Sequence, residues 1–183
     1  MPFFFRTWKD IEIVLCNLAA MRCPLCGASG TLIRHGFLRG FVAHNRRGIR
    51  GRRVRCKRSP RRKGCAHTFS LRITGTLPRR CFNAQGLWAF IQGLREGRSI
   101  KAAWEGSATG LSLDTGYRVF QRLQLCRAAL RTRLCNRSPP PEKGEDAGSA
   151  LLRTFAHLEG VFGNECAVSA YQEALQKDFL AIA

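Results

Sequence analysis

The chain has 183 residues, of which 45% are hydrophobic and 23% are charged, and its formal net charge is +19. This length allows one or two small domains with modest cores and excludes a large one. The apolar start is interrupted by Arg6, Lys9, Asp10 and Glu12, so no hydrophobic run is long enough for export or for a membrane span, and no membrane partner is expected.

The positive charge is concentrated in one part of the chain. No Asp or Glu occurs between Glu12 and Glu96, whereas residues 13–95 carry 18 Lys or Arg. Repulsion among these positive charges destabilises a compact state unless a polyanion neutralises them. Nucleic acid is therefore the predicted partner. An acidic lipid surface is the competing partner. It is disfavoured because the basic residues fall in predicted strands and loops, not along one face of an amphipathic helix.

Residues 1–20 form a predicted N-terminal segment, and residues 7–20 within it suit a short helix or strand. Its apolar residues then share one side of the element: Trp8, Ile11, Val14 and Leu15. Met21 follows directly, so translation starting at Met1 and translation starting at Met21 both stay open.

Four of the nine cysteines have the spacing of a metal site. Cys23 and Cys26 lie in the sequence Cys-Pro-Leu-Cys-Gly, and Cys56 and Cys65 flank a basic spacer of eight residues. A two-residue gap followed by glycine lets one tight turn direct two thiolates at one ion, and Zn²⁺ accepts four such ligands. We therefore predict Zn²⁺ as the cofactor, bound by Cys23, Cys26, Cys56 and Cys65.

Two alternatives to this ligand set stay open. His67 follows Cys65 by two residues and can replace it, although structural sites favour thiolate. The four cysteines can also be buried or disulfide-bonded, which the Cys-Pro-Leu-Cys-Gly turn argues against. An odd number of cysteines without a secretory signal indicates a reduced, cytoplasmic compartment. The other five are expected to be small buried hydrophobic side chains: Cys16, Cys81, Cys126, Cys135 and Cys166.

Residues 21–78 predict a zinc ribbon, in which a small antiparallel sheet joins two metal-binding turns. The predicted strands are residues 31–40, 49–55 and 68–74, with turn chemistry at residues 45–48. Such a domain buries too little apolar surface to fold alone, so the ion replaces the missing core.

Residues 79–135 predict three helices, over residues 83–94, 99–105 and 112–126, the last with an extension to residue 134. Each begins at a residue that caps helices well: Asn83, Ser99 and Ser112. Three helices with a glycine-containing turn between the last two form the helix-turn-helix pattern.

Residues 136–149 are a linker by composition. Residues 150–183 predict a helical tail with two short helices, over residues 151–162 and 166–180. Their apolar stretches are too small for an independent core, so we expect the tail to dock on the helical domain or on another chain. The predicted fold class is therefore α+β: a zinc-ribbon β domain, a helix-turn-helix three-helix domain and a short helical C-terminal tail.

Two groups of residues are predicted to bind nucleic acid. Arg forks onto phosphate oxygens, and a metal-pinned loop holds several at fixed spacing. The predicted phosphate-binding residues are Arg46, Arg47, Arg50, Arg52, Arg53, Arg55, Lys57, Arg58, Arg61, Arg62 and Lys63. The predicted base-reading group lies near the start of the third helix: Ser112, Thr115, Arg118, Gln121 and Arg122. For the phosphate-binding group the alternative is a solvated charged face, and for the base-reading group it is a plain core helix. Trp88, Trp104 and Tyr117 are expected in the core.

No catalytic site is predicted. The twelve Asp and Glu lie in the linker, in the tail and at scattered positions, with no βαβ scaffold to gather two or three carboxylates around metal ions. A Cys65–His67 pair is no nucleophile when the Cys65 thiolate binds zinc. We therefore expect a binding protein and not an enzyme.

Several motifs together resemble a known family. They are Cys23-Pro-Leu-Cys-Gly through Gly64-Cys-Ala-His-Thr-Phe69, then Arg98-Ser-Ile-Lys-Ala-Ala-Trp104, then Tyr117-Arg118. This pattern resembles the zinc ribbon and helix-turn-helix at the front of bacterial insertion-sequence transposases, especially short stand-alone relatives that lack the catalytic domain. The resemblance covers about residues 21–125. The resemblance implies DNA binding within a mobile element. The long second cysteine spacer and the missing carboxylate domain depart from full transposases, so their activity is not carried over to this chain.

The sequence thus predicts a zinc-dependent, DNA-binding accessory or regulatory protein of a bacterial mobile element. Double-stranded DNA is the main expected partner, RNA is a second one, and residues 150–183 are a candidate site for a protein partner. Two alternatives are a structural subunit of a larger nucleoprotein that touches RNA or an RNA–DNA hybrid, and a non-catalytic subunit of a recombinase.

Overall fold

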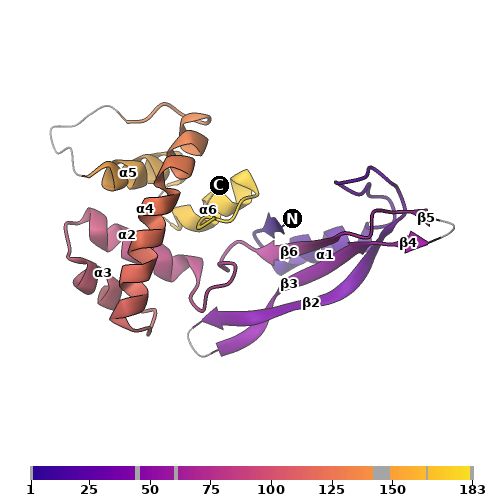
Figure 1. Cartoon of the computed structure of the whole chain (residues 1–183), viewed down its shortest axis with the longest axis horizontal. Coiled ribbons are helices and arrows are strands. Elements are labelled where there is room, and N and C mark those ends of the chain that lie inside the picture. The colour runs from indigo at the N-terminus through magenta and orange to yellow at the C-terminus, as the bar shows by residue number, and fades with distance from the viewer. Residues whose placement is uncertain (1, 44–45, 60–61, 142–148, 164, 182–183) are drawn as a thin grey trace.

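The computed structural model describes residues 2–43, 46–59, 62–141, 149–163 and 165–181. Figure 1 shows two lobes side by side: a sheet lobe that contains the strands and the first helix, and a helical lobe that contains the next four helices. The last helix lies between them. The predicted α+β fold class is confirmed at this level.

The sheet lobe is built on four strands in the order β1 (Pro2–Phe5), β6 (Thr68–Ile73), β3 (Arg46–Cys56) and β2 (Leu32–Ala43). β1 runs parallel to β6, and the other pairs are antiparallel. β4 (Arg58–Ser59) and β5 (Arg62–Lys63) form a separate two-stranded pair. The three predicted strands correspond to β2, β3 and β6, whereas β1 was not predicted.

The element predicted as a helix or strand within residues 7–20 is a helix, α1 (Trp8–Cys16). Thr7 caps it, because its hydroxyl accepts from Asp10 N while the Asp10 carboxylate accepts from Thr7 N. Ile11 and Leu15 are buried against the sheet and share a core with Val54 of β3. Residues 2–16 therefore contribute one strand and one helix to the sheet lobe.

The helical lobe begins with α2 (Ala84–Arg95), α3 (Ile100–Gly106) and α4 (Leu113–Cys135). Two predicted caps are confirmed: Asn83 Oδ1 accepts from Gly86 N, and Ser99 Oγ accepts from Ala102 N. Ser112 precedes α4 as predicted but does not cap it with its side chain. Its hydroxyl instead lies 3.2 Å from that of Thr115.

The tail forms α5 (Ala150–Phe162) and α6 (Ala167–Leu175). Leu151, Phe155 and Tyr171 are buried in one core with α2, α3 and α4. The tail thus docks on the helical lobe, one of the two expected arrangements. α6 ends earlier than the predicted residue 180.

Side chains from the C-terminal part join the two lobes. The buried Gln172 donates from Nε2 to Thr74 O at 2.6 Å and to Thr76 O at 3.2 Å. Gln176 accepts from Phe4 N at 2.7 Å and donates to Phe4 O at 2.8 Å. These bonds attach the end of α6 to the sheet lobe. Among the helices that the structure describes, none is both long and apolar enough for a bilayer crossing.

Candidate metal centre and nucleic-acid interface

The four cysteines predicted as metal ligands meet at one end of the sheet lobe. The Sγ atoms of Cys23, Cys26, Cys56 and Cys65 all lie within 4.8 Å of one another. Cys23 Sγ is 3.6 Å from Cys65 Sγ, and Cys26 Sγ is 3.8 Å from Cys56 Sγ. A tetrahedral site with Zn–S bonds of about 2.3 Å has S···S separations of about 3.8 Å. The cluster can therefore hold a metal ion, and its size and donor set fit Zn²⁺.

The first cysteine pair lies in a tight turn. Gly27 N donates to Cys23 O at 2.8 Å, and Cys23 N donates to Ala28 O at 2.9 Å. Gly27 has a φ of +71°, a conformation that glycine adopts without steric cost. This backbone is the reason the Cys-Pro-Leu-Cys-Gly sequence directs Cys23 and Cys26 toward the same point.

The second pair is formed by the end of β3 and the chain after β5. The long spacer contains the β4–β5 pair, so Cys65 returns beside Cys56 despite eight intervening residues. Cys65 N lies 3.3 Å from Cys56 Sγ and donates to it. A Cβ at Gly64 would lie 2.2 Å from Lys57 O and 2.7 Å from Cys56 Sγ. Only glycine allows this close approach.

The thiols of the cluster do not ionise independently. Burial opposes ionisation of Cys56, but hydrogen bonds involving Thr31 and Cys65 lower its pKa to about 7. The pKa of Cys65 is raised to about 11: the His67 amide lowers it, but burial and the neighbouring sulfurs outweigh that. A second thiolate beside the first is repelled, and a bound cation removes that repulsion.

The alternatives for these cysteines are decided in part. All nine cysteines are free thiols, which contradicts a disulfide framework. His67 is exposed, and its Nδ1 lies 3.2 Å from Cys65 O. Of the five other cysteines, Cys126 is buried as expected, whereas Cys16 and Cys135 are exposed. Those two are the last residues of α1 and α4, and the expectation of burial was wrong for them.

Most of the predicted phosphate-binding side chains that the structure describes are exposed. They are Arg46, Arg47, Arg53, Arg55, Lys57 and Arg58. Among the described residues, the ion pairs are Arg52–Glu12, Arg95–Glu159 and Arg98–Glu96, so none of the six exposed bases has a carboxylate partner there. Arg61 lies outside the described residues, as do the side chains of Arg62 and Lys63.

Arg53 and Arg55 project from the face of the sheet opposite α1. They are the cross-strand neighbours of Ser70 and Thr68 in β6, and such neighbours share a face. Val54, between them, is buried against α1. The outer face therefore combines guanidinium and hydroxyl groups, both of which bind phosphate oxygens.

Arg50 and Arg52 depart from the prediction. Arg50 is 5% exposed and donates from Nη1 to Arg80 O at 3.1 Å and from Nη2 to Leu77 O. Arg50 therefore binds the segment between β6 and α2 and is not available to a ligand. Arg52 is half-buried and pairs with Glu12 at 2.8 Å.

The predicted base-reading residues lie on α4 or, for Ser112, directly before it. Ser112, Arg118 and Gln121 are exposed and Thr115 is half-buried. Arg122 is turned away from this group, because its Nε donates to Leu180 O at 2.9 Å.

Of the three aromatic side chains expected in the core, two are buried. Trp88 is 0% exposed and Trp104 is 2% exposed. The prediction was wrong for Tyr117, which is 45% exposed beside Arg118.

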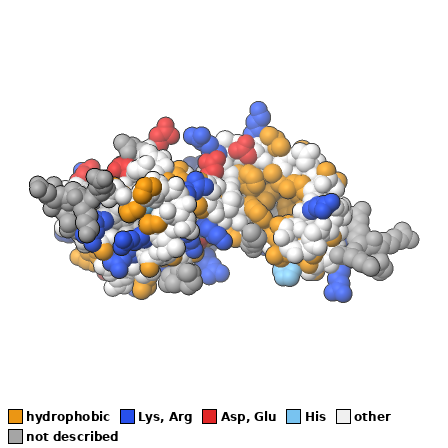
Figure 2. All heavy atoms as spheres, turned by 90° about the horizontal axis from the view of Figure 1, so that it is seen from above, with side chains coloured by type: hydrophobic (Ala, Val, Ile, Leu, Met, Phe, Trp, Pro, Cys, Tyr) orange, Lys and Arg blue, Asp and Glu red, His pale blue; other side chains and the backbone are white. Residues whose placement is uncertain are grey.

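Sequence reasoning missed the aromatic side chains at the surface of the sheet lobe. Figure 2 shows hydrophobic side chains gathered there, on the right in that view. Trp8, Phe37 and Ile49 are among the exposed ones. In β2 the alternation Phe37-x-Arg39-x-Phe41 is the signal that could have found them, since alternate residues share a face of a strand.

We compared the chain with models of known protein families, with curated proteins and with solved structures, and none of them matches.

Proposed function

We propose that this protein is a zinc-dependent, non-catalytic, DNA-binding accessory or regulatory protein of a bacterial mobile element. The observation that carries the proposal is the set of six exposed Lys and Arg side chains without a carboxylate partner in the described chain. Unneutralised cations at fixed positions on a rigid sheet favour a polyanion, because each phosphate contact releases condensed counterions.

The cysteine cluster supplies the rigidity in this proposal. Cys23, Cys26, Cys56 and Cys65 would hold the ion, which adds folding free energy that a sheet lobe of this size lacks. Cys56 ends β3, the strand that carries Arg53 and Arg55. An ion bound there therefore supports the strand that presents these arginines to phosphate.

The base-reading role in this proposal falls to the helical lobe. We propose that α3 and α4 act as a helix-turn-helix pair in which α4 enters the major groove. Arg118 would fork onto guanine and Gln121 onto adenine, and the exposed Tyr117 lies next to them. The apolar residues of the tail are buried in its own lobe, so a partner protein would have to contact its polar outer side.

The proposal is tested by binding of a labelled DNA duplex at salt concentrations from about 50 to 200 mM. Six phosphate contacts predict a loss of about 10³-fold in affinity over this range. The double variant Arg53→Ala/Arg55→Ala should reduce the slope of log K against log salt by about 2, roughly one per contact. The control variant Arg131→Ala/Lys177→Ala removes the same charge from exposed positions outside the sheet. A flat salt response, or an equal effect of both double variants, would contradict the proposal.

A further inference from the structure

One face of the β2–β3 hairpin carries a repeated pairing of phenylalanine with arginine. Phe37 is the cross-strand partner of Arg52, and Phe41 is the partner of Arg47. Ile49 lies between the two arginines and faces Arg39. Cross-strand partners share a face, as do alternate residues of a strand. Both Phe–Arg pairs therefore lie on one face of the hairpin, separated by about 13 Å along β2.

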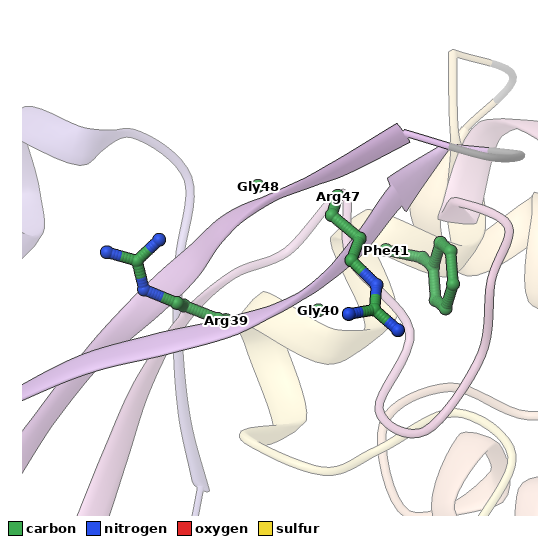
Figure 3. A pocket seen from close by; sticks show the side chains of 5 residues that line it. All are labelled: Arg39, Gly40, Phe41, Arg47 and Gly48. Atoms are coloured by element: carbon green, nitrogen blue, oxygen red, sulfur yellow. The ribbon is translucent and has the colours of Figure 1, made fainter.

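Both arginines stack on their phenylalanines. Arg52 Cζ lies 3.9 Å from the centroid of the Phe37 ring, and Arg47 Cζ lies 5.2 Å from that of Phe41. These distances are within the range of cation–π contacts. Figure 3 shows the Arg47 guanidinium beside the Phe41 ring, with Arg39 extending away from this pair. Glu12 holds Arg52 in place at 2.8 Å.

Each pair borders an open cavity. Phe37 and Arg52 line one of about 360 Å³ together with Trp8 and Ile49. Trp8, Phe37 and Ile49 are 41%, 44% and 38% exposed.

Phe41 and Arg47 line the other cavity, of about 440 Å³. Gly40, Gly48 and Arg39 complete its lining. We call the surface that carries both cavities the stacking face, defined by Trp8, Phe37, Phe41, Arg47, Ile49 and Arg52.

We propose that the stacking face binds the unpaired bases of single-stranded nucleic acid. The inference rests on the proposed function, because nucleic acid is the ligand in both, and it adds a substrate class: a strand with accessible base faces. Bases stack on aromatic rings and on guanidinium planes regardless of sequence. In a duplex these base faces are covered by neighbouring base pairs, so only an unpaired base can enter the cavities.

Charge complementarity favours this occupant over an apolar partner surface. The hairpin lies inside the stretch from residue 13 to 95 that contains no Asp or Glu. Arg39 and Arg47, which line the second cavity, are exposed, as is the neighbouring Arg46. A hydrophobic protein partner would leave these charges unpaired, whereas a nucleic-acid strand brings phosphate with each base.

Tryptophan fluorescence of the full chain tests the inference directly. Of the three tryptophans, Trp88 and Trp104 are buried and Trp8 is exposed, so quenching by a stacked base reports on Trp8. We would titrate the protein with three ligands of equal length: an oligo(dT) strand, an abasic strand with the same phosphates, and a duplex. The inference predicts strong quenching by oligo(dT) and little by the other two. It also predicts that oligo(dT) binds about tenfold more tightly than the abasic strand.

Variants test whether oligo(dT) binds at the stacking face. Phe37→Ala and Phe41→Ala should each weaken oligo(dT) binding by about 5- to 100-fold while leaving the abasic strand unaffected. Leu125→Ala is the matched control, since Leu125 is an apolar side chain 65% exposed on α4. Thermal unfolding of each variant checks that it folds. If one variant does not fold, the other still tests the inference.

The outcomes separate the inference from the proposed function. If no polyanion binds, the proposed function fails and the inference with it. If duplex and abasic strand bind but oligo(dT) gains nothing and Trp8 is not quenched, the inference alone is overturned. If Phe37→Ala instead converts a dimer to a monomer in sedimentation without changing strand binding, the face joins two copies of this chain, which also overturns it.

Discussion

Gly116 of α4 lies directly against the indole ring of Trp104 in α3. A Cβ built at Gly116 would be 2.6 Å from Trp104 Cγ and 2.8 Å from Cδ2. The ring cannot move aside easily, because its Nε1 donates to Leu111 O and Ser112 O at 3.1 and 3.0 Å. It also makes an edge contact with Phe90 at 5.1 Å between centroids. Glycine at this position therefore sets how closely α3 and α4 pack.

Gly116→Ala should destabilise the protein by about 1–3 kcal/mol, the usual cost of overpacking, although alanine is the better helix former by about 1 kcal/mol. Gly160→Ala in α5 is the matched control. A Cβ there meets nothing within 4 Å, so we expect a gain of up to about 1 kcal/mol. Urea unfolding followed by circular dichroism measures both variants. Equal signs for the two would contradict the packing role of Gly116.

Removal of the metal should unfold the sheet lobe while the helical lobe keeps its helices. The two lobes have separate hydrophobic cores, and the cysteine cluster belongs to the sheet lobe alone. We expect one Zn²⁺ per chain by mass spectrometry, lost in Cys26→Ser, with most helical circular dichroism retained. Cys135→Ser changes an exposed thiol of the helical lobe and should keep the ion. Full metal content in Cys26→Ser would rule out the four-cysteine site.

Gln176→Asn should destabilise the contact between the tail and β1. The Gln176 amide makes two hydrogen bonds with the Phe4 backbone, in place of a neighbouring strand. Asparagine keeps the amide and tolerates the left-handed conformation of residue 176, with φ of 52°, but its side chain is one methylene shorter. Two lost bonds predict a cost of about 1–3 kcal/mol, measured by urea unfolding. Faster amide hydrogen exchange at Phe4 would locate the loss, and unchanged exchange there would argue against it.

The half-buried Asp178 makes stability depend on pH. Burial raises its pKa above the ordinary value of 3.8, although Arg72 and Arg80 act to lower it. The folded state then holds the proton more tightly than the unfolded state, so this group favours folding below pH 3.8 and loses that contribution as pH rises through the folded pKa. The unfolding free energy of wild type minus that of Asp178→Asn should fall from pH 3.5 upward. A difference that rises with pH would show that the arginines outweigh burial.

Arg118→Ala should affect sequence preference more than overall affinity. A bidentate contact with a base discriminates by about 1–3 kcal/mol, whereas a phosphate contact contributes equally on every sequence. Selection of bound duplexes from a random pool should therefore lose information at one position in Arg118→Ala. Arg53→Ala should keep the same preferred sequence at lower affinity. If both variants behave alike, α4 does not read bases.

Local signals were sufficient to predict much of the fold and the cysteine cluster. Asn83 and Ser99 cap their helices in the structure because an amide or hydroxyl oxygen next to the first free N–H groups favours that end. Cys23 and Cys26 meet their partners because the glycine-ended turn fixes both thiols. Each of these features depends on a few neighbouring residues.

Features that depend on distant pairing were not predicted. β1 pairs with residues 70–73, and no pattern within Pro2–Phe5 indicates that neighbour. Arg50 lies at a bulge, since the register passes from Leu38–Gly51 to Arg39–Ile49 and leaves Arg50 as an extra residue. A bulge reverses the alternation of side chains. Arg50 therefore points away from the side of Arg52 and is buried.

The bond between Gln176 and Phe4 has a consequence for the order in which the protein assembles on the ribosome. The two residues are 172 positions apart, and synthesis at about 5–20 residues per second separates them by roughly 10–30 seconds. During that interval the outer edge of β1 lacks its amide partner and is open to other strands. Nascent chains halted before residue 176 should therefore be more prone to edge-to-edge association than the released protein.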